Sequence, residues 1–345
     1  MAATPPHPTD RPDELAGTPV LVLGGRGYLG RHVCSAFAAA GARVVRVSRG
    51  AGGDRDEDGC RTVRLDLAAA GPAELAWLCA GTGARVVVNA SGAVWGGDER
   101  EMTELNSTLV SRLARAVAEQ PGRPRLIHLG SAYEYGPAPP GTSIGEDWPL
   151  RPASVYGRTK LLGSQAVLRA AAELGLDAVV LRVSVACGPG APGNSLPGVV
   201  ASHLAAGREE LRLAPLRSHR DLVDVRDVAD AVLAAAVAPA GASGAVLNIG
   251  GGTAVPVREL VDTVISLSGL PMRVVEDPAL GLTRSDAAWQ LLDISRARRQ
   301  LGWEPRRTLR ESLRDLLTDA GVVPPPVARA ATASVPLNSH TKDSR

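Results

Sequence analysis

Short apolar runs alternate with alanine-rich stretches along the first half of the chain. Because the runs are apolar throughout rather than alternating with polar residues, they indicate strands buried on both faces, as in a parallel sheet. The alternation of strands and helices therefore predicts an α/β fold of Rossmann type, a doubly wound parallel sheet. The predicted strands are 19–24, 42–48, 61–65, 84–90, 124–130 and 177–183, and the clearest predicted helices are 30–41, 99–120 and 154–174.

The pattern loosens after residue 186, where proline and glycine loops separate shorter elements. This change favours a smaller lobe that covers the sheet where the strand order reverses. Both ends of the chain lack helical or strand periodicity, which is typical of disorder. The predicted organisation is a disordered tail at 1–17, a dinucleotide-binding domain at 18–185 to which 218–250 returns, a substrate-binding lobe at 186–217 and 251–322, and a second disordered tail at 323–345.

Composition excludes several classes of protein. The 345 residues carry 38 basic and 36 acidic side chains, a net charge of +2 that gives no argument for nucleic-acid or membrane binding. The four cysteines lie far apart and histidines do not cluster, so neither a disulfide framework nor a metal site is expected, and a reducing cytoplasm is favoured. No run approaches the ~18 apolar residues of a membrane span, and the N-terminus lacks the apolar core of a signal peptide.

The loop between the first strand and the first helix is rich in glycine. Its G-x-x-G-x-x-G spacing permits a tight turn and a close approach of the backbone to a pyrophosphate, which the helix N-terminus also binds. A purely structural turn is the alternative, but the position in the first β-α-β unit favours a dinucleotide site. The cofactor-binding candidates in this loop are Gly24, Arg26, Gly27, Tyr28, Leu29 and Gly30.

The end of the second predicted strand indicates which dinucleotide binds. An NAD site usually has a carboxylate here for the ribose 2′-hydroxyl, whereas this chain has Ser48 and Arg49. An arginine can pair with a 2′-phosphate, and Arg26 could add a second charge. We therefore expect NADP(H) rather than NAD(H), unless both arginines are only solvated surface charges. Asp66, followed by Leu67, is placed to accept a hydrogen bond from the adenine amino group.

Tyr156 and Lys160 lie four residues apart on a predicted helix, so they share one face. The lysine is notable because Lys160 and Lys342 are the only lysines among 38 basic residues. A free tyrosine has a pKa of about 10, and a nearby ammonium lowers it. An ammonium is also compact enough to hold the ribose hydroxyls of a nicotinamide cofactor, where the planar fork of arginine would not substitute. The pair predicts an acid–base group. The alternative is a chance spacing of tyrosine and lysine on a surface helix.

Together with the glycine loop, four stretches of the sequence carry a family resemblance. They are "NASG" (89–92), "GSAYEYG" (130–136), "YGRTK" (156–160) and "LDISRARRQLGW" (292–303). Over residues 18–320 the chain resembles the extended short-chain dehydrogenase/reductase family, of the NAD-dependent epimerase/dehydratase type. The resemblance implies that Tyr156 and Lys160 also contact the cofactor, and that the substrate is a nucleotide-diphosphate sugar. It adds Ser131 and Asn106 as catalytic residues, Asn89, Ala90 and Ser91 as cofactor-binding residues, and Ser131, Tyr133, Arg220 and Arg284 as substrate-binding residues.

The family pattern also bears on the reaction. Dehydratases of the family have Asp-Glu directly after the catalytic Ser/Thr, whereas here Ala132 and Tyr133 follow Ser131, and Glu134 is one place out of register. A dehydration is therefore disfavoured, because its proton carriers are missing. The family's usual asparagine after the sixth strand is replaced by Val185, which leaves the grip on the sugar nucleotide less defined.

Within the family the stretches "NASGAVWG", "GTSIGED" and "YGRTKL" look most like bacterial reductases of the 4-keto group of dTDP-4-keto-6-deoxyhexoses. The resemblance implies an NADPH-dependent, cytoplasmic oxidoreductase of deoxysugar biosynthesis for natural products such as antibiotics. The helices near 99–120 and 154–174 resemble those that form a homodimer interface in the family. Two alternatives stay open, an NAD(P)-dependent nucleotide-sugar epimerase and a non-catalytic dinucleotide-sensing protein on the same fold.

Overall fold

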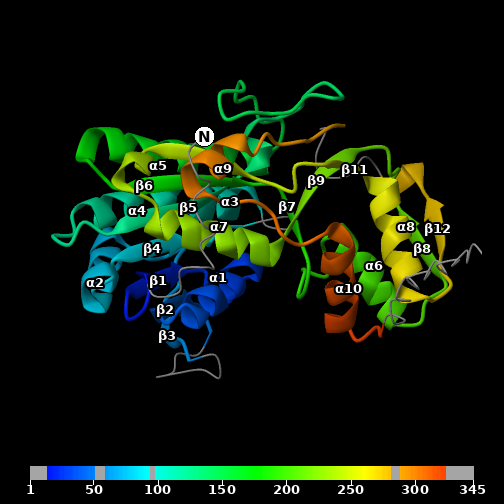
Figure 1. Cartoon of the computed structure of the whole chain (residues 1–345), viewed down its shortest axis with the longest axis horizontal. Coiled ribbons are helices and arrows are strands. Elements are labelled where there is room, and N and C mark those ends of the chain that lie inside the picture. The colour runs from blue at the N-terminus through cyan, green and yellow to red at the C-terminus, as the bar shows by residue number, and fades with distance from the viewer. Residues whose placement is uncertain (1–13, 51–58, 94–97, 281–287, 324–345) are drawn as a thin grey trace, which may run out of the picture.

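The central sheet consists of β1 (Pro19–Leu23), β2 (Arg43–Ser48), β3 (Arg61–Arg64), β4 (Val86–Asn89), β5 (Arg125–Ser131), β6 (Ala178–Val183) and β10 (Ala245–Ile249). The computed structural model describes residues 14–50, 59–93, 98–280 and 288–323. The strand order is β10-β6-β5-β4-β1-β2-β3, and every neighbouring pair is parallel (Figure 1). The chain leaves β1 in one direction for β2 and β3, and then crosses back to β4. This arrangement confirms the predicted Rossmann-type α/β fold.

Helices cover both faces of this sheet. One face carries α1 (Tyr28–Ala39), α7 (Val225–Val237) and α9 (Ser295–Leu301), and the other carries α2 (Pro72–Thr82), α4 (Leu109–Ala118) and α5 (Val155–Leu174). Strand β1 shows why its sequence is apolar throughout. Val20 and Val22 pack into the core beneath α1, whereas Leu21 and Leu23 pack into the opposite core. Both faces of a central parallel strand therefore need apolar side chains.

A second, smaller unit lies beside the carboxyl ends of the strands, on the right of Figure 1. It has its own apolar core. Its elements are the sheet β11-β9-β7 (Ala254–Pro256, His219–Asp224, Val185–Cys187), the pair β8 (Glu210–Leu213) and β12 (Arg273–Glu276), and the helices α6 (Leu196–Ala205), α8 (Val257–Ser268) and α10 (Leu309–Asp319). Only part of the segment 218–250 therefore returns to the central sheet. Helix α7 and β10 return, but β9 pairs with β7 and β11 of the lobe.

The predicted helix at 99–120 is divided into three pieces. Helix α3 (Glu99–Thr103) continues into a π-helical turn, η3 (Glu104–Thr108), before α4 begins. The turn lies where this segment meets α5 closely, because a Cβ on Gly163 would be 2.1 Å from the carbonyl oxygen of Asn106. Single π-turns of this kind often mark functional sites.

The ends of the chain are only partly described. Residues 1–13 and 324–345, which cover most of both predicted tails, lie outside the described residues, as does Arg284. The predicted first tail extends too far, because Leu15 is 5% exposed and packs in the core with α1. Within the described ranges no helix has the length and apolar character needed to cross a membrane.

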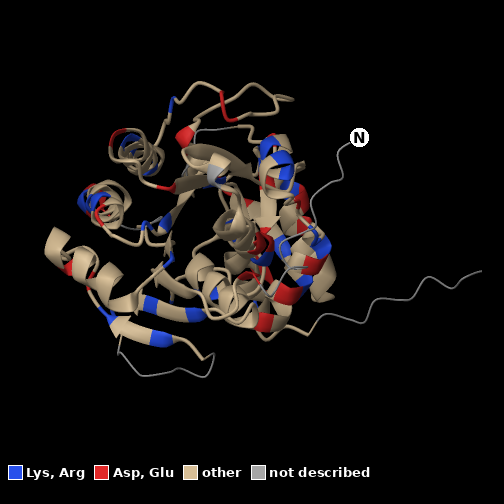
Figure 2. Cartoon of the chain, turned by 60° about the vertical axis from the view of Figure 1, so that its left-hand side comes forward, with Lys and Arg blue, Asp and Glu red and all other residues tan. Residues whose placement is uncertain are grey.

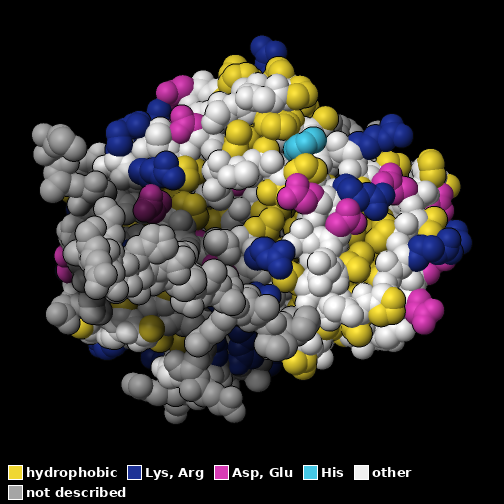
Figure 3. Space-filling view, turned by 45° about the vertical axis from the view of Figure 1, so that its right-hand side comes forward, with side chains coloured by type: hydrophobic (Ala, Val, Ile, Leu, Met, Phe, Trp, Pro, Cys, Tyr) yellow, Lys and Arg dark blue, Asp and Glu magenta, His cyan; other side chains and the backbone are white. Residues whose placement is uncertain are grey.

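Charged residues of both signs are interspersed in the structure (Figure 2). The face turned toward the viewer in Figure 3 likewise shows basic and acidic side chains next to one another, with apolar side chains between them. This mixture agrees with the small net charge of +2. Charge therefore does not single out this face as a surface for a strongly charged partner.

The contact between α5 and η3 yields a stability prediction. In most helices a Gly→Ala substitution stabilises by up to about 1 kcal/mol, but at Gly163 the new methyl group would meet the backbone of Asn106. We expect Gly163→Ala to lower the free energy of unfolding by about 1–3 kcal/mol, as overpacking does, in a urea titration. Gly81→Ala is the matched control, since its Cβ would meet only Trp77, at 4.0 Å. Equal stabilisation by both substitutions would contradict the close contact.

Candidate active site

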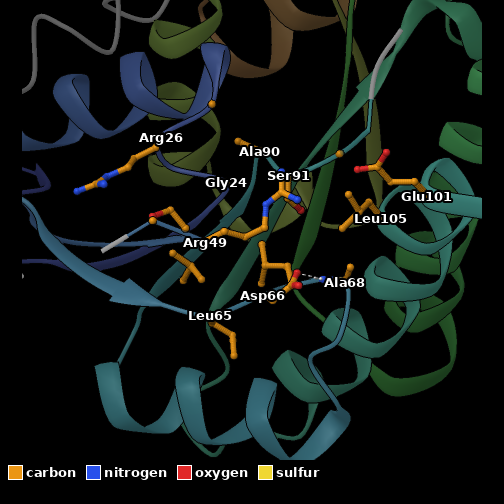
Figure 4. Close-up of a pocket in the computed structure, with 16 residues that line it drawn as sticks. Gly24, Arg26, Arg49, Leu65, Asp66, Ala68, Ala90, Ser91, Glu101 and Leu105 are labelled. Atoms are coloured by element: carbon orange, nitrogen blue, oxygen red, sulfur yellow. Dashed lines mark hydrogen bonds between the residues drawn. The ribbon is translucent and has the colours of Figure 1, made fainter. Parts of the chain in front are cut away.

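A cavity of about 420 Å³ opens at the carboxyl ends of β1 to β4 (Figure 4). Its lining brings together most of the predicted cofactor-binding residues, which come from four separate segments of the chain. Glu101 of α3 and Leu105 of η3 close its other side and were not predicted, because nothing in the sequence around them marks a ligand site. The predicted residues that line it are Gly24, Arg26, Gly27, Ser48, Arg49, Asp66, Leu67, Ala90 and Ser91.

The glycine loop fits a dinucleotide phosphate. A Cβ on Gly30 would lie 2.1 Å from the carbonyl oxygen of Gly24, and one on Gly24 would lie 2.8 Å from the backbone of Ser91. Gly24 also has a φ of +75°, which favours glycine. Helix α1 begins directly after Gly27, which caps it without a side chain, so the first N–H groups face the loop. Such a helix start is suited to bind phosphate.

Polar groups also gather where the 2′-position of the adenosine ribose is expected. The Ser48 hydroxyl is buried, and among the described residues it has no hydrogen-bond partner. A Cβ on Gly50 would lie 3.0 Å from Nη1 of Arg26 and 3.8 Å from Oγ of Ser48, so these two side chains converge at one point. Arg49 extends into the same pocket (Figure 4). The far wall carries Asp66, whose Oδ1 accepts a hydrogen bond from the Ala68 N–H at 3.1 Å.

A second cavity of about 290 Å³ adjoins the first, since Gly27, Ala90, Ser91 and Gly92 line both. It collects the predicted reactive residues from β5, η3 and α5. Polar side chains that were not predicted, Ser184, Asn194 and Ser195, come from the start of the lobe, where neither periodicity nor a quoted motif marked them. The predicted residues that line it are Tyr28, Leu29, Asn106, Ser131, Tyr133, Tyr156 and Lys160, together with Val185.

Ser131 and Tyr156 form the centre of this cavity. Ser131 ends β5, and Tyr156 is the second residue of α5, whose N-cap Ser154 accepts a hydrogen bond from the Gly157 N–H at 3.1 Å. The Ser131 hydroxyl lies near the Tyr156 phenol and acts to lower its pKa. The ring of Tyr133 meets that of Tyr156 edge-on, with 5.7 Å between their centroids. The serine hydroxyl and the phenol are thus fixed side by side in the cavity.

The electrostatics of Tyr156 differ from the prediction. Loss of solvent raises the pKa of Tyr156 to about 12, and the neighbouring Ser131 hydroxyl only partly offsets this. The prediction that Lys160 lowers this pKa is wrong for this structure, because the Lys160 ammonium instead donates to the Leu129 carbonyl at 2.5 Å. At neutral pH Tyr156 is a phenol that carries its proton, the form that a general acid requires.

Lys160 is buried on the inner face of α5, with 5% of its surface exposed. Burial lowers the pKa of Lys160 to about 8, and the nearby Glu134 carboxylate opposes this change. His128, fully buried on β5, has a pKa held well below its usual range by burial and by the Lys160 charge. Lys160 therefore keeps its positive charge at neutral pH, beside a neutral histidine.

Two predicted asparagines hold the chain in place. The Asn106 carboxamide accepts from the Ala93 N–H and donates to the Ala93 carbonyl, both at 3.0 Å, and donates to Thr159 Oγ1 at 3.1 Å. Asn106 thereby fixes the loop after β4 against α5. Asn89 lines neither cavity, but its Oδ1 accepts hydrogen bonds from the Ser91 hydroxyl at 2.5 Å and the Ser91 N–H at 3.2 Å.

The structure does not bring the predicted Arg220 to either cavity. Arg220 is on β9, 8% exposed, with Nη1 donating to the His219 carbonyl at 2.8 Å, and it lines neither cavity. Arg284 lies outside the described residues. Glu134, which the sequence places out of register for dehydration, is fully buried and forms an ion pair with Arg182 at 2.8 Å. Its carboxylate is thus held away from the substrate cavity.

A Rossmann-type sheet with a glycine-lined groove, joined to a cavity that holds Ser131, Tyr156 and Lys160, defines a dinucleotide-dependent enzyme. Residues 20–250 match the model of the NAD dependent epimerase/dehydratase family, and the chain belongs to this family. Its cofactor is accordingly a nicotinamide dinucleotide. The glycine loop and the unpartnered Ser48 hydroxyl fit such a group.

Two similar proteins are named for the 4-position of a sugar nucleotide, and a similar solved structure holds a sugar nucleotide and NAD. The chain is 42% identical to a dTDP-6-deoxy-L-talose 4-dehydrogenase (NAD(P)(+)) of Kitasatospora kifunensis, over 88% of this chain and 96% of that protein. It is 31% identical to a UDP-glucose 4-epimerase of Azospirillum brasilense, over 85% and 89% of the two chains. The solved structure of MoeE5 in complex with UDP-glucuronic acid and NAD superposes with a TM-score of 0.77 at 26% identity, covering 88% and 98%.

The site yields a prediction for Tyr156. Tyr156→Phe removes the proton but keeps the ring, so we expect turnover to fall at least about 100-fold, the low end of general acid contributions. Cofactor affinity, measured by fluorescence titration, should change little. Tyr133→Phe is the comparison variant, because its ring lines the same cavity and the substitution keeps the backbone N–H that donates to Ser131 Oγ at 3.3 Å. Near wild-type turnover in the Tyr156 variant would show that another group is the acid.

Proposed function

We propose that this protein reduces the C4 keto group of a nucleotide-activated 4-keto-6-deoxyhexose, as its dTDP derivative, with NADPH. The observation that carries the proposal is that the Ser131 hydroxyl and a protonated Tyr156 line one cavity, which adjoins the cofactor groove. Two hydroxyl donors in one cavity suit a carbonyl oxygen that gains negative charge. The 42% identical relative named for the 4-position of a dTDP-6-deoxy sugar supports the substrate class.

The residues define the steps of this reaction. Nicotinamide, when bound, supplies the hydride to the carbonyl carbon. Ser131 donates a hydrogen bond to the substrate oxygen, and Tyr156 transfers its phenolic proton to the alkoxide that forms. The high pKa of Tyr156, about 12, keeps that proton in place until the alkoxide, a much stronger base than the phenolate, appears. Lys160 lines the same cavity and keeps a positive charge at neutral pH.

NADPH is proposed because of the side chains at the first cavity. Ser48, Arg49 and Arg26 surround the expected 2′-position, and among the described residues that line this cavity none places a carboxylate on β2, where it would repel a phosphate. The two carboxylates of the lining, Asp66 and Glu101, belong to other segments of the chain. NADPH also fits a reductase, which consumes its cofactor in each turnover, better than an epimerase, which regenerates its bound cofactor.

An epimerase is the second candidate, since the chain is 31% identical to a UDP-glucose 4-epimerase over most of its length. Stoichiometry separates the two functions. With dTDP-4-keto-6-deoxyglucose and NADPH, we expect one NADPH to be consumed for each 4-hydroxy sugar nucleotide formed, followed by absorbance and product analysis. Product formed without loss of NADPH would identify an epimerase. Tight cofactor binding without reaction on any 4-keto sugar nucleotide would favour a dinucleotide sensor.

The cofactor choice yields a prediction for Arg49. Each charge-assisted hydrogen bond to a 2′-phosphate contributes about 1.5–3 kcal/mol. We expect the protein to bind NADPH more tightly than NADH, and Arg49→Ala to weaken NADPH binding at least about tenfold while NADH binding stays unchanged. Arg169→Ala, an exposed arginine of α5 outside both cavities, serves as control. Equal affinity of the wild-type protein for both reduced cofactors would remove NADPH as the proposed cofactor.

We further propose a homodimer formed through α4 and α5. Leu162 and Leu174 of α5 are 47% and 49% exposed. Helices rich in Ala and Leu, as α5 is, pack closely against one another. We expect a dimer in light scattering at micromolar concentration, and a monomer for Leu162→Glu. Leu270→Glu, at an equally exposed leucine of the lobe (44%), should stay dimeric. A monomeric wild-type protein would contradict this assembly.

The cellular setting proposed for this reaction is the cytoplasm, in the biosynthesis of deoxysugars for natural products such as antibiotics. All four cysteines, Cys34, Cys60, Cys79 and Cys187, are buried free thiols. Free thiols are typical of a reducing compartment.

A further inference from the structure

Glu134 is the most completely enclosed carboxylate beside the candidate active site, with no exposed surface. It ends η4 (Ala132–Glu134), the short 3-10 helix that follows Ser131. Its Oε1 accepts hydrogen bonds from the Ser131 N–H at 2.8 Å and from the Ser164 hydroxyl at 2.9 Å. Its Oε2 accepts from Nε of Arg182 at 2.8 Å. One carboxylate thus joins the end of β5, the inner face of α5 and strand β6.

The surrounding residues are fitted to this carboxylate. Gly130 pairs with Arg182 across β5 and β6, and a Cβ on Gly130 would lie 2.7 Å from Oε1 of Glu134 and 3.1 Å from the Ser164 hydroxyl. Only glycine at position 130 leaves this space free for the Glu134 carboxylate. Ser164 follows Lys160 by one helical turn, so both face the same side of α5. The carboxylate therefore holds Ser131 against the stretch of α5 that carries Lys160.

We propose that Glu134 is a positioning residue of the ketoreduction, which fixes the distance between Ser131 on β5 and the Tyr156–Lys160 face of α5. This inference rests on the proposed function. It differs from the role that a glutamate next to the catalytic serine has in a dehydratase, because the carboxylate does not line the substrate cavity. Glu134 acts on the substrate only through Ser131, Tyr156 and Lys160.

The charge of Glu134 adds an electrostatic effect that a merely structural contact would lack. It raises the pKa of both Tyr156 and Lys160, and so favours the forms that carry a proton. The other groups that face this pair are Tyr133, which also raises the pKa of Tyr156, and the neutral His128 beneath Lys160. Arg182 is paired with Glu134 itself, on the side of β6. Glu134 is thus the negative charge that stabilises the Lys160 ammonium in its buried site.

The scarcity of lysine makes this effect directly measurable. Lys160 and Lys342 are the only lysines of the chain, so protein labelled with 13C at lysine Cε gives two NMR signals that can be titrated separately. In Glu134→Gln we expect the pKa of Lys160 to fall below its wild-type value by about one pH unit, the low end of the effect of a nearby opposite charge. The signal of Lys342 should titrate as in the wild-type protein.

The double variant Glu134→Gln with Arg182→Met guards against unfolding, because Glu134→Gln alone leaves a buried, unpaired guanidinium, whereas apolar replacement of a buried ion pair is often tolerated. In a folded variant we expect the lower pKa of Lys160 together with a kcat for ketoreduction at least about tenfold lower and an NADPH Kd within about twofold. Glu210→Gln, at the exposed ion pair with Arg273, is the control and should change neither quantity.

An unchanged titration of Lys160 in a folded variant, or an unchanged kcat, would overturn the proposal. A wild-type protein that reduces no 4-keto sugar nucleotide would instead remove the proposed function. In that case the lysine titration still decides whether Glu134 controls Lys160, because this measurement needs neither substrate nor turnover.

Discussion

The active site depends on how closely α5 approaches the end of β5. Ser131 belongs to the strand and Tyr156 to the helix, so the two side chains can line one cavity only where the two backbones lie in near contact. A Cβ on Gly157 would be 2.4 Å from the Tyr133 carbonyl oxygen, and one on Gly163 would be 2.1 Å from that of Asn106. Glycine is required on both sides of the Tyr156–Lys160 turn because backbone, rather than flexible side chain, occupies the space. The π-helical turn at Asn106 is the other half of this contact.

Close approach also excludes water, and this sets the chemistry. The pKa of Tyr156 rises and that of Lys160 falls, because burial disfavours the charged form of each group. A neutral phenol and a still-charged ammonium suit proton delivery to a carbonyl. The reverse reaction would require the phenolate, which this environment disfavours.

The sequence predicted most of the fold because its signals are local. Apolar runs marked every strand from β1 to β6, and the glycine loop marked the start of α1. Helix α2 was not predicted, since its exposed Trp77 (69%) interrupts the polar face that identifies an amphipathic helix. The sequence predicted the site residues that lie in or near a motif, but it did not predict Glu101, Ser184 and Asn194. Glu101 lines the first cavity, and Ser184 and Asn194 line the second. All three meet the cavities only through the topology, which no spacing in the sequence reveals.

The single lysine of the folded domain is explained by the same constraint of space and solvent. Among the described residues of the site, Arg182 shows what a buried guanidinium needs here, namely the Glu134 carboxylate and stacking on the Tyr135 ring, 4.6 Å from its centroid. Lys160 instead donates to the Leu129 carbonyl. An arginine stays charged under all conditions, whereas a lysine with a pKa of about 8 can respond to the groups around it. In a chain that otherwise uses arginine for nearly every positive charge, this position requires a small cation whose protonation its neighbours can adjust.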